Sequence, residues 1–127
     1  MSRVPAQLAR AALLLLLIGC GAARGPGSTS NRNVLSLEEM QQAGYSDAFT
    51  TVQSLRPQWL VKRGATSSRA QSIKVYLDGS LLGPPESLRQ ITTRSISHMQ
   101  YLNGLQASER YGLDHDLGAI LVTTRRD

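Results

Sequence analysis

The stretch Ile73–Gly79 has the sequence IKVYLDG and alternates between apolar and more polar residues before it ends at a turn pair. An alternation of period two over this length predicts a half-buried strand. The side chains expected to face inward are Ile73, Val75 and Leu77. Lys74 is expected to face water. Because the segments that follow read as helix, strand, helix and strand, we expect this strand to lie in the middle of a small sheet.

The composition is that of a small globular protein. The chain has 127 residues, of which 41% are hydrophobic, 18% charged and 5% aromatic, so we expect one domain with a largely aliphatic core. The formal net charge is +5, but Arg3 and Arg10 lie in a segment that we expect to be cleaved. Removing these two from the 14 basic residues leaves 12 against 9 acidic residues. This small excess is weak support for a polyanion partner.

The first 19 residues have the layout of an export signal. Arg3 and Arg10 form a basic start, and Ala11–Ile18 is an uninterrupted apolar run. Such a run after a basic start is typical of secretory signal peptides. It has about half of the roughly 20 residues that a transmembrane helix needs. We therefore expect a signal peptide over residues 1–19 and no membrane span.

The segment LIGC at positions 17–20 resembles the lipobox of bacterial lipoproteins. In that family the cysteine is acylated and becomes the new N-terminus, so cleavage would fall between Gly19 and Cys20, and Cys20 would anchor the protein to a membrane. A buried structural thiol or a reactive nucleophile needs surrounding structure that a signal segment lacks, and a lone cysteine has no disulfide partner. The next residue is Gly21 and not aspartate, which in lipoproteins implies the outer membrane of a Gram-negative cell.

The folded domain is expected over residues 34–127, after a lipidated flexible tether over residues 20–33 that is rich in Gly, Ser, Asn and Arg. Ser36 and Glu39 have the spacing of a capping box, in which each side chain satisfies a free backbone N–H at a helix start. Gly44 supplies a stop signal. The domain therefore opens with a short helix.

A second helix is predicted after Ser46, which can cap it, with Asp47 in its first turn. Its apolar stripe consists of Ala48, Phe49, Val52 and Leu55. Pro57 ends the helix. Trp59 is expected to pack against the helices and not to serve as a ligand platform.

The rest of the chain reads as strands and short helices. Ser80–Leu82 is predicted as a hairpin arm, Glu86–Ile91 as a short helix, and Ser95–Leu102 as a strand with either a bulge or a late start. Leu105–Tyr111 is predicted as a helix that the following glycine ends in the left-handed conformation. Gly118–Thr124 is predicted as a strand buried on both faces. The expected fold class is α+β, a small mixed sheet with short helices.

The order of these pieces resembles the plug domain of TonB-dependent outer-membrane receptors. The motifs that carry the resemblance are VYLDG (75–79), LRQI (88–91), ISHMQYL (96–102), ASERYG (107–112) and GAILVTT (118–124). The resemblance covers about Val34 to Arg125 and implies a plug-like fold.

A receptor plug lies inside a large barrel, which this chain is too short to contain. A barrel of 22 strands at about 10 residues each would need more than 200 further residues. The resemblance therefore implies a stand-alone plug-like domain, tethered by a lipid in place of a covalent link to a barrel. We expect a non-catalytic binding or interaction module, accessory to an outer-membrane barrel, with its ligand unknown.

A small exported enzyme is one alternative function. Asp114, His115 and Asp116 could offer metal ligands, but consecutive side chains rarely converge on one ion, so we expect a solvated loop there. His98 is expected to be a strand residue with a local hydrogen-bond partner. The chain has no nucleophile elbow and no phosphate-cradling glycine loop, so we predict no catalytic residue, metal or cofactor.

A polyanion-binding lipoprotein is the other alternative. Arg56, Lys62, Arg63 and Arg69 gather in and beside a polar segment that reads as an exposed loop. They could contact lipopolysaccharide phosphates or peptidoglycan carboxylates, although a solvated basic loop is the simpler interpretation. Nucleic acid is not an expected partner of an exported chain.

Overall fold

The computed structural model describes residues 31–61 and 72–126. It has the expected α+β fold, a five-stranded mixed sheet with short helices. Across the sheet the strands are β1 (Val34–Ser36), β4 (Ile96–Leu102), β5 (Ala119–Thr124), β2 (Lys74–Leu77) and β3 (Ser80–Gly83). β2 and β5 run parallel, and the other neighbours are antiparallel. The three strands predicted from sequence patterns around Ile73, Ser95 and Gly118 are therefore neighbours in one sheet.

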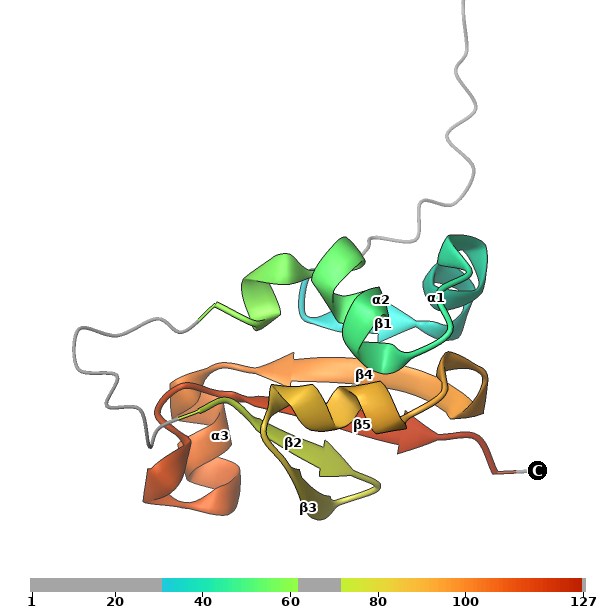
Figure 1. Cartoon of the computed structure of the whole chain (residues 1–127). Helices are drawn as coiled ribbons and strands as arrows, with labels where there is room; N and C mark the ends of the chain where they lie inside the picture. Colours follow the sequence, from blue (N-terminus) through green and yellow to red (C-terminus); the bar gives the residue numbers. More distant parts are fainter. Residues whose placement is uncertain (1–30, 62–71, 127) are drawn as a thin grey trace, which may run out of the picture.

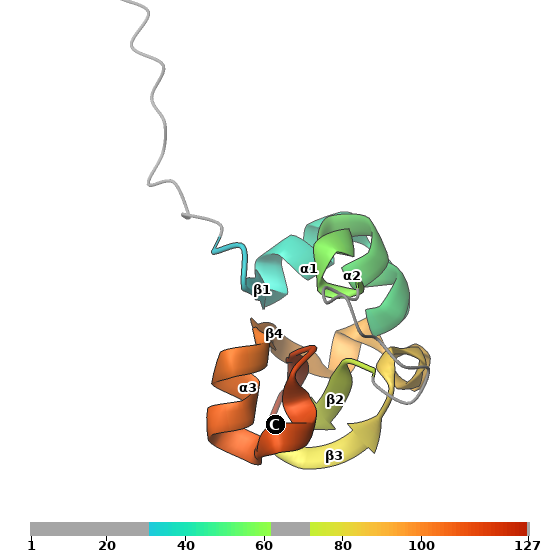
Figure 2. The same ribbon diagram turned by 90° about the vertical axis from the view of Figure 1, so that its left-hand side faces the viewer.

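Helices lie on both faces of the sheet (Figures 1 and 2). On one face lie α1 (Leu37–Ala43), α2 (Ala48–Leu55) and the 3-10 helices η1 (Pro57–Trp59) and η2 (Pro85–Gln90). On the other lie α3 (Gly104–Tyr111) and the 3-10 helix η4 (Leu113–His115), while η3 (Thr93–Ser95) leads into β4. We call these two sides of the sheet the α2 face and the α3 face.

The main core lies on the α2 face. It contains Leu35, Met40, Ala48, Val52, Trp59, Ile73, Val75, Leu88, Ile91, Ile96, Met99, Leu117, Ile120 and Val122, all buried. Every strand except β3 and every helix on this face contributes side chains to it. Alternate residues of a strand point to the same face of the sheet, and those that point to the α2 face enter this core. Ile73 and Val75 face inward as predicted, with Leu77 packed against their cluster.

β5, and not β2, is the central strand, which corrects the expected position of the Ile73–Gly79 strand. β5 buries Ile120 on the α2 face and Ala119 on the α3 face, as its two-sided apolar pattern predicts. β2 has a strand on each side but carries the half-buried Lys74. The middle of the sheet belongs to the strand that has apolar side chains on both faces.

Local hydrogen bonds explain where the first two helices begin. The Ser36 Oγ accepts from the Glu39 backbone N–H, and the Glu39 carboxylate accepts from the Ser36 backbone N–H at 3.0 Å, which confirms the capping box. Asp47, and not Ser46, caps α2, with its carboxylate accepting from the Thr50 backbone N–H at 2.9 Å. The helix starts one residue later than predicted because the Ser46 carbonyl accepts from the Thr93 N–H and Asp47 forms a bridge with Thr92.

Two other details differ from the expectation. Gly112 ends α3 with φ 103° and ψ 179°. The positive φ is one that glycine adopts readily, but the ψ lies outside the left-handed helical conformation that was predicted. β1 pairs with β4 in a strand of three residues, too short to show a period in the sequence. The predicted bulge in β4 is present between Ile96 and His98, and the short helix after Pro84 is the 3-10 helix η2.

Candidate functional site

The α3 face is much less covered than the α2 face. Its buried cluster consists of Tyr76, Leu102, Ala107 and Ala119, with Tyr111 and Leu121 partly buried against it. Since Leu81 on β3 is paired with Tyr76, its side chain lies on the same face, where it is 59% exposed. The sheet therefore presents an apolar side chain to solvent on its outermost strand, β3.

Three further leucines on this side of the molecule are exposed. Leu82 follows Leu81 in β3, Leu105 in α3 is 71% exposed, and Leu113 in η4 is 88% exposed. β3 ends the strand order, so among the described residues its outer edge has no strand partner. Exposed apolar groups next to an open strand edge are typical of a surface that another chain covers. The candidate site is this edge, which carries Leu81 and Leu82. Leu105 and Leu113 are exposed on the helices of the same side of the sheet.

A buried histidine fixes α3 and η4 against β2. His115 is only 6% exposed, and its Nε2 lies 2.7 Å from the Tyr76 hydroxyl. Its Nδ1 lies 2.9 Å from the carbonyl oxygen of Gly112. Because a carbonyl can only accept, Nδ1 carries the proton, and in the neutral ring Nε2 accepts from Tyr76. Neither ring nitrogen is directed to solvent.

Aromatic rings complete this cluster. Tyr111 stacks on Tyr76 with ring centroids 4.0 Å apart, and its ring centroid lies 5.5 Å from that of His115. Burial raises the pKa of the Tyr76 hydroxyl, and Tyr111 raises it further. The hydroxyl therefore stays protonated and able to donate to His115.

The prediction of a solvated loop at residues 114–116 is wrong for His115. Asp114 and Asp116 are exposed, but the residue between them is buried. The partner that buries His115 is Tyr76, 39 residues away. No local pattern indicates such a contact, and the only signal in the sequence was the tyrosine on the polar side of a predicted strand.

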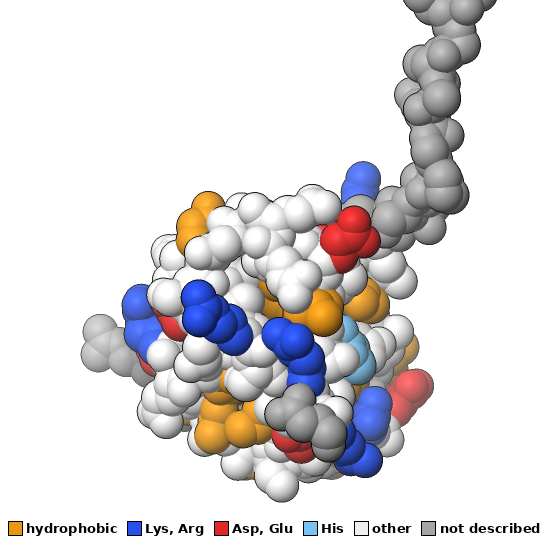
Figure 3. All heavy atoms as spheres, turned by 90° about the vertical axis from the view of Figure 1, so that its right-hand side faces the viewer, with side chains coloured by type: hydrophobic (Ala, Val, Ile, Leu, Met, Phe, Trp, Pro, Cys, Tyr) orange, Lys and Arg blue, Asp and Glu red, His pale blue; other side chains and the backbone are white. Residues whose placement is uncertain are grey.

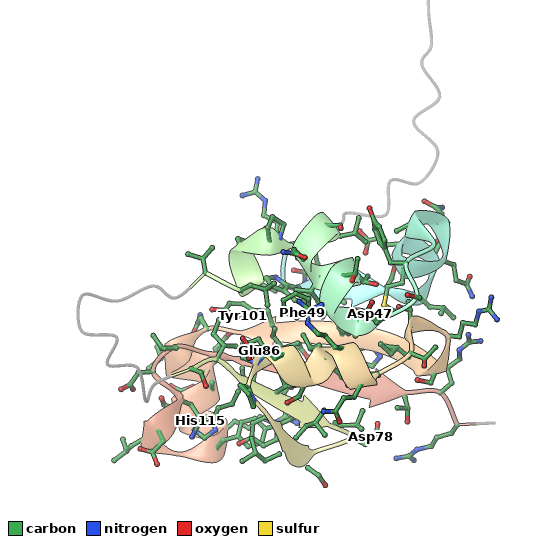
Figure 4. The ribbon with its side chains drawn as sticks, in the orientation of Figure 1. Asp47, Phe49, Asp78, Glu86, Tyr101 and His115 are labelled. Atoms are coloured by element: carbon green, nitrogen blue, oxygen red, sulfur yellow. The ribbon has the colours of Figure 1, made fainter. Side chains whose placement is uncertain are left out.

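Asp78, in the turn of the β2–β3 hairpin, is hydrogen-bonded to the end of β5. It lies well away from His115 (Figure 4). Its carboxylate accepts from the Thr124 hydroxyl and, at 2.8 Å, from the Thr124 backbone N–H. These two bonds, with the charge of Arg126, hold the pKa of Asp78 below its usual value. The positive φ of 48° at Asp78 is one that aspartate tolerates in a tight turn. The open edge of the sheet is thus presented by a fixed hairpin.

The residues predicted to contact a polyanion are not gathered into a described site. The Arg56 guanidinium forms a salt bridge with Glu39 at 2.8 Å, and its side chain is only 12% exposed. It serves to join the end of α2 to α1. Lys62, Arg63 and Arg69 lie outside the described residues, as do Gly19 and Cys20 with the predicted lipid anchor.

Trp59 and His98 have structural surroundings. Trp59 is buried, stacks on Tyr101 with centroids 5.9 Å apart and donates from its indole N–H to the Arg32 carbonyl at 3.0 Å. It is therefore a core residue, as predicted, although its ring stacks on a strand residue. His98 is exposed on β4, with the Ser97 hydroxyl as its local partner at 3.5 Å.

Within residues 31–61 and 72–126, no three His, Cys, Asp or Glu side chains come together as a set of metal ligands. In the same part of the chain, no helix has the length and apolar character needed to cross a bilayer. Neither a family model nor a curated protein matches the sequence. The plug-domain resemblance stays a prediction from the order of the motifs.

Proposed function

We propose that this chain is an outer-membrane lipoprotein whose folded domain is a plug-like, non-catalytic binding module, accessory to a barrel of the outer membrane. The observation that carries the proposal is the thin cover of the α3 face, with exposed leucines beside an open strand edge. The partner class follows from two predictions, the plug-like order of the motifs and the lipid anchor at Cys20.

The exposed leucines supply a driving force for association. Burying a leucine side chain that was exposed contributes about 1.5–3 kcal/mol. Leu81 is carried by a hairpin that Asp78 fixes to Thr124, and Leu113 is in the 3-10 helix that His115 fixes to Tyr76. Because these carriers are already held in place, little ordering is needed when a partner binds.

The engagement of the buried histidine supports a non-catalytic role. A general base needs a nitrogen within hydrogen-bond reach of its substrate. In His115, Nε2 is hydrogen-bonded to the Tyr76 hydroxyl and Nδ1 to the Gly112 carbonyl oxygen. The ring therefore connects these two parts of the fold.

A lipid at Cys20 would keep the domain close to its partner. Each buried methylene contributes about 0.8 kcal/mol, and stable anchoring needs more than one acyl chain. The tether over residues 20–33 could span up to about 45 Å when extended. Confinement to the membrane raises the effective concentration of the module next to a barrel.

The test is mild crosslinking of the native protein in membranes of its own organism, followed by co-purification. Recovery of an outer-membrane barrel supports the proposal, and recovery of the chain alone contradicts it. A Cys20→Ser variant tests the anchor separately: the proposal expects loss of the acyl mass and release from the outer-membrane fraction. An unacylated Cys20 in the mature native protein would overturn the anchor.

A further inference from the structure

A basic hollow lies at the end of the molecule away from the His115 cluster. It has a volume of about 600 Å³ and lies between α1, the α1–α2 connection, η3 and the end of β5. This end faces the viewer in Figure 3, which shows basic side chains gathered beside hydrophobic ones. A hollow of this size is within the range of small-molecule sites.

Two arginines give the hollow its charge. Arg94 and Arg125 line it, and none of its lining residues is acidic. Both are exposed, and the one salt bridge within the described residues joins other side chains, Arg56 and Glu39. The charge of these two guanidiniums is therefore not neutralised by a carboxylate of the described chain.

Hydrogen bonds hold the walls of the hollow in position. The Arg125 guanidinium donates to the Arg94 carbonyl at 2.6 Å, and the Arg125 backbone N–H donates to the Ser95 carbonyl. On the other side, the Thr93 N–H donates to the Ser46 carbonyl at 2.9 Å. Segments distant in the sequence are thus joined around the cavity, which reduces the ordering cost of binding.

Apolar side chains of α1 and of the α1–α2 connection also line the hollow. Leu37 is half-buried, and Tyr45 is 38% exposed. Met40, also part of the lining, is fully buried. A ligand matched to this lining would carry an anionic group for the arginines and an apolar body for Leu37 and Tyr45.

We infer that this hollow binds a phosphate monoester carried on an apolar body. A phosphate monoester has a charge of about −1.5 to −2 at neutral pH, which matches two guanidiniums better than the single charge of a carboxylate. The planar guanidinium also presents paired N–H donors that suit phosphate oxygens. None of the exposed leucines of the candidate site lines this hollow, so the inference stands or falls independently of the barrel partner.

The test is a titration of the full chain followed by two-dimensional NMR of its backbone amides, with three probes. Dihexanoyl phosphatidate carries both parts of the ligand, inorganic phosphate carries only the anion, and dihexanoyl phosphatidylcholine has no net charge. We expect the amides of Ser46, Thr93 and Arg94 to shift with phosphatidate while those of α3 do not. Phosphatidate should bind several times more tightly than inorganic phosphate, and the zwitterionic lipid should bind most weakly.

Variants separate the two parts of the site. Arg94→Gln and Arg125→Gln should each weaken phosphatidate binding about tenfold, because each removes a charge-assisted hydrogen bond. Arg110→Gln, an exposed arginine on α3, is the matched control and should leave it unchanged. Tyr45→Ser should weaken binding of phosphatidate but not of inorganic phosphate.

Absence of binding by the native protein, or equal weakening by Arg110→Gln, would overturn the site. Equal affinity for inorganic phosphate and phosphatidate would overturn the apolar part and identify a free anion as the ligand. Shifts spread over α3 would indicate nonspecific adsorption and also contradict the inference.

Discussion

The two faces of the sheet are built differently from the same strands. On the α2 face, 14 buried side chains from strands and helices form one continuous cluster. On the α3 face, the buried cluster consists of three strand side chains and Ala107 of α3, while Leu81 on β3 remains exposed. Burial of apolar area is the main favourable term in folding. The α2 face therefore carries most of the stability, which leaves the α3 side with surface for a partner.

Neighbouring residues of β5 give the most direct comparison of the two faces. Ile120 is fully buried on the α2 face, whereas Leu121 is half-buried on the α3 face. We expect Ile120→Ala to lower the free energy of unfolding by about 2–5 kcal/mol, because it leaves a cavity in a packed core. Leu121→Ala should cost clearly less. Urea unfolding of both variants measures the difference, and an equal or larger loss for Leu121→Ala would break the comparison.

The few polar contacts on the α3 face should matter more individually because its apolar cluster is small. Tyr76→Phe removes the hydroxyl that His115 uses, and leaves a buried ring nitrogen without its partner. We expect a loss of about 1–3 kcal/mol, measured by urea unfolding, with Tyr45→Phe at an exposed ring as the control. A loss no greater than that of the control would show that the pair does not hold α3 and η4 in place.

The cap of α1 tests a smaller contribution on the α2 face. Ser36→Ala removes the side chain that accepts from the Glu39 N–H, and we expect a loss of about 1 kcal/mol. Ser54→Ala, at an exposed position inside α2, should be neutral or slightly stabilising because alanine favours a helix interior. Thermal unfolding of both variants distinguishes a cap effect from a general effect of removing a hydroxyl.

Two aspartates predict a modest loss of stability in acid, one at the N-cap of α2 and one in the β2–β3 turn. The backbone N–H of Thr50 holds the pKa of Asp47 below its usual value of 3.8, and the Thr124 hydroxyl does the same for Asp78. A carboxyl group whose pKa is lower in the folded state stabilises the protein above its unfolded pKa, and this stabilisation disappears as the pH falls through the folded pKa.

The free energy of unfolding should therefore decline as the pH falls below about 4, where these carboxyl groups begin to take up protons in the unfolded state. Asp47→Asn and Asp78→Asn should each flatten part of this decline, with little difference between the two because both carboxylates are near solvent. Urea midpoints from pH 5 to pH 2 provide the measurement. If the urea midpoint fell with pH as steeply in both variants as in the native protein, Asp47 and Asp78 would not be the source of the acid sensitivity.

Local patterns predicted the elements better than their places in the sheet. Period-two runs predicted the strands around Val75 and Ile120, a less regular apolar pattern predicted the strand around Met99, and the Ser36 capping box predicted the start of α1. The central strand is β5 and not β2 as predicted. The order of strands in a sheet depends on how both faces of every strand are covered, and no single local pattern contains that information. The sequence also showed an apolar pattern on both faces of β5, but not how thinly the second face would be covered.

The candidate site was less predictable than the fold. The buried contact between His115 and Tyr76 joins residues far apart in the chain, so no local spacing indicates it. Arg56 looked available beside a basic loop, yet its guanidinium lies against Glu39, which the capping box also uses. Exposure of Leu81 follows from the end position of β3, and that position depends on the complete strand order.

The central claim is that the α3 side is covered by a partner and the α2 side is not. Its most direct test places a photo-crosslinking residue at Leu81, and in a matched variant at the exposed Gln53 of α2, followed by irradiation of membranes from the native organism. We predict an adduct with an outer-membrane barrel from position 81 and none from position 53. Adducts of equal yield from both positions, or from position 53 alone, would contradict the account.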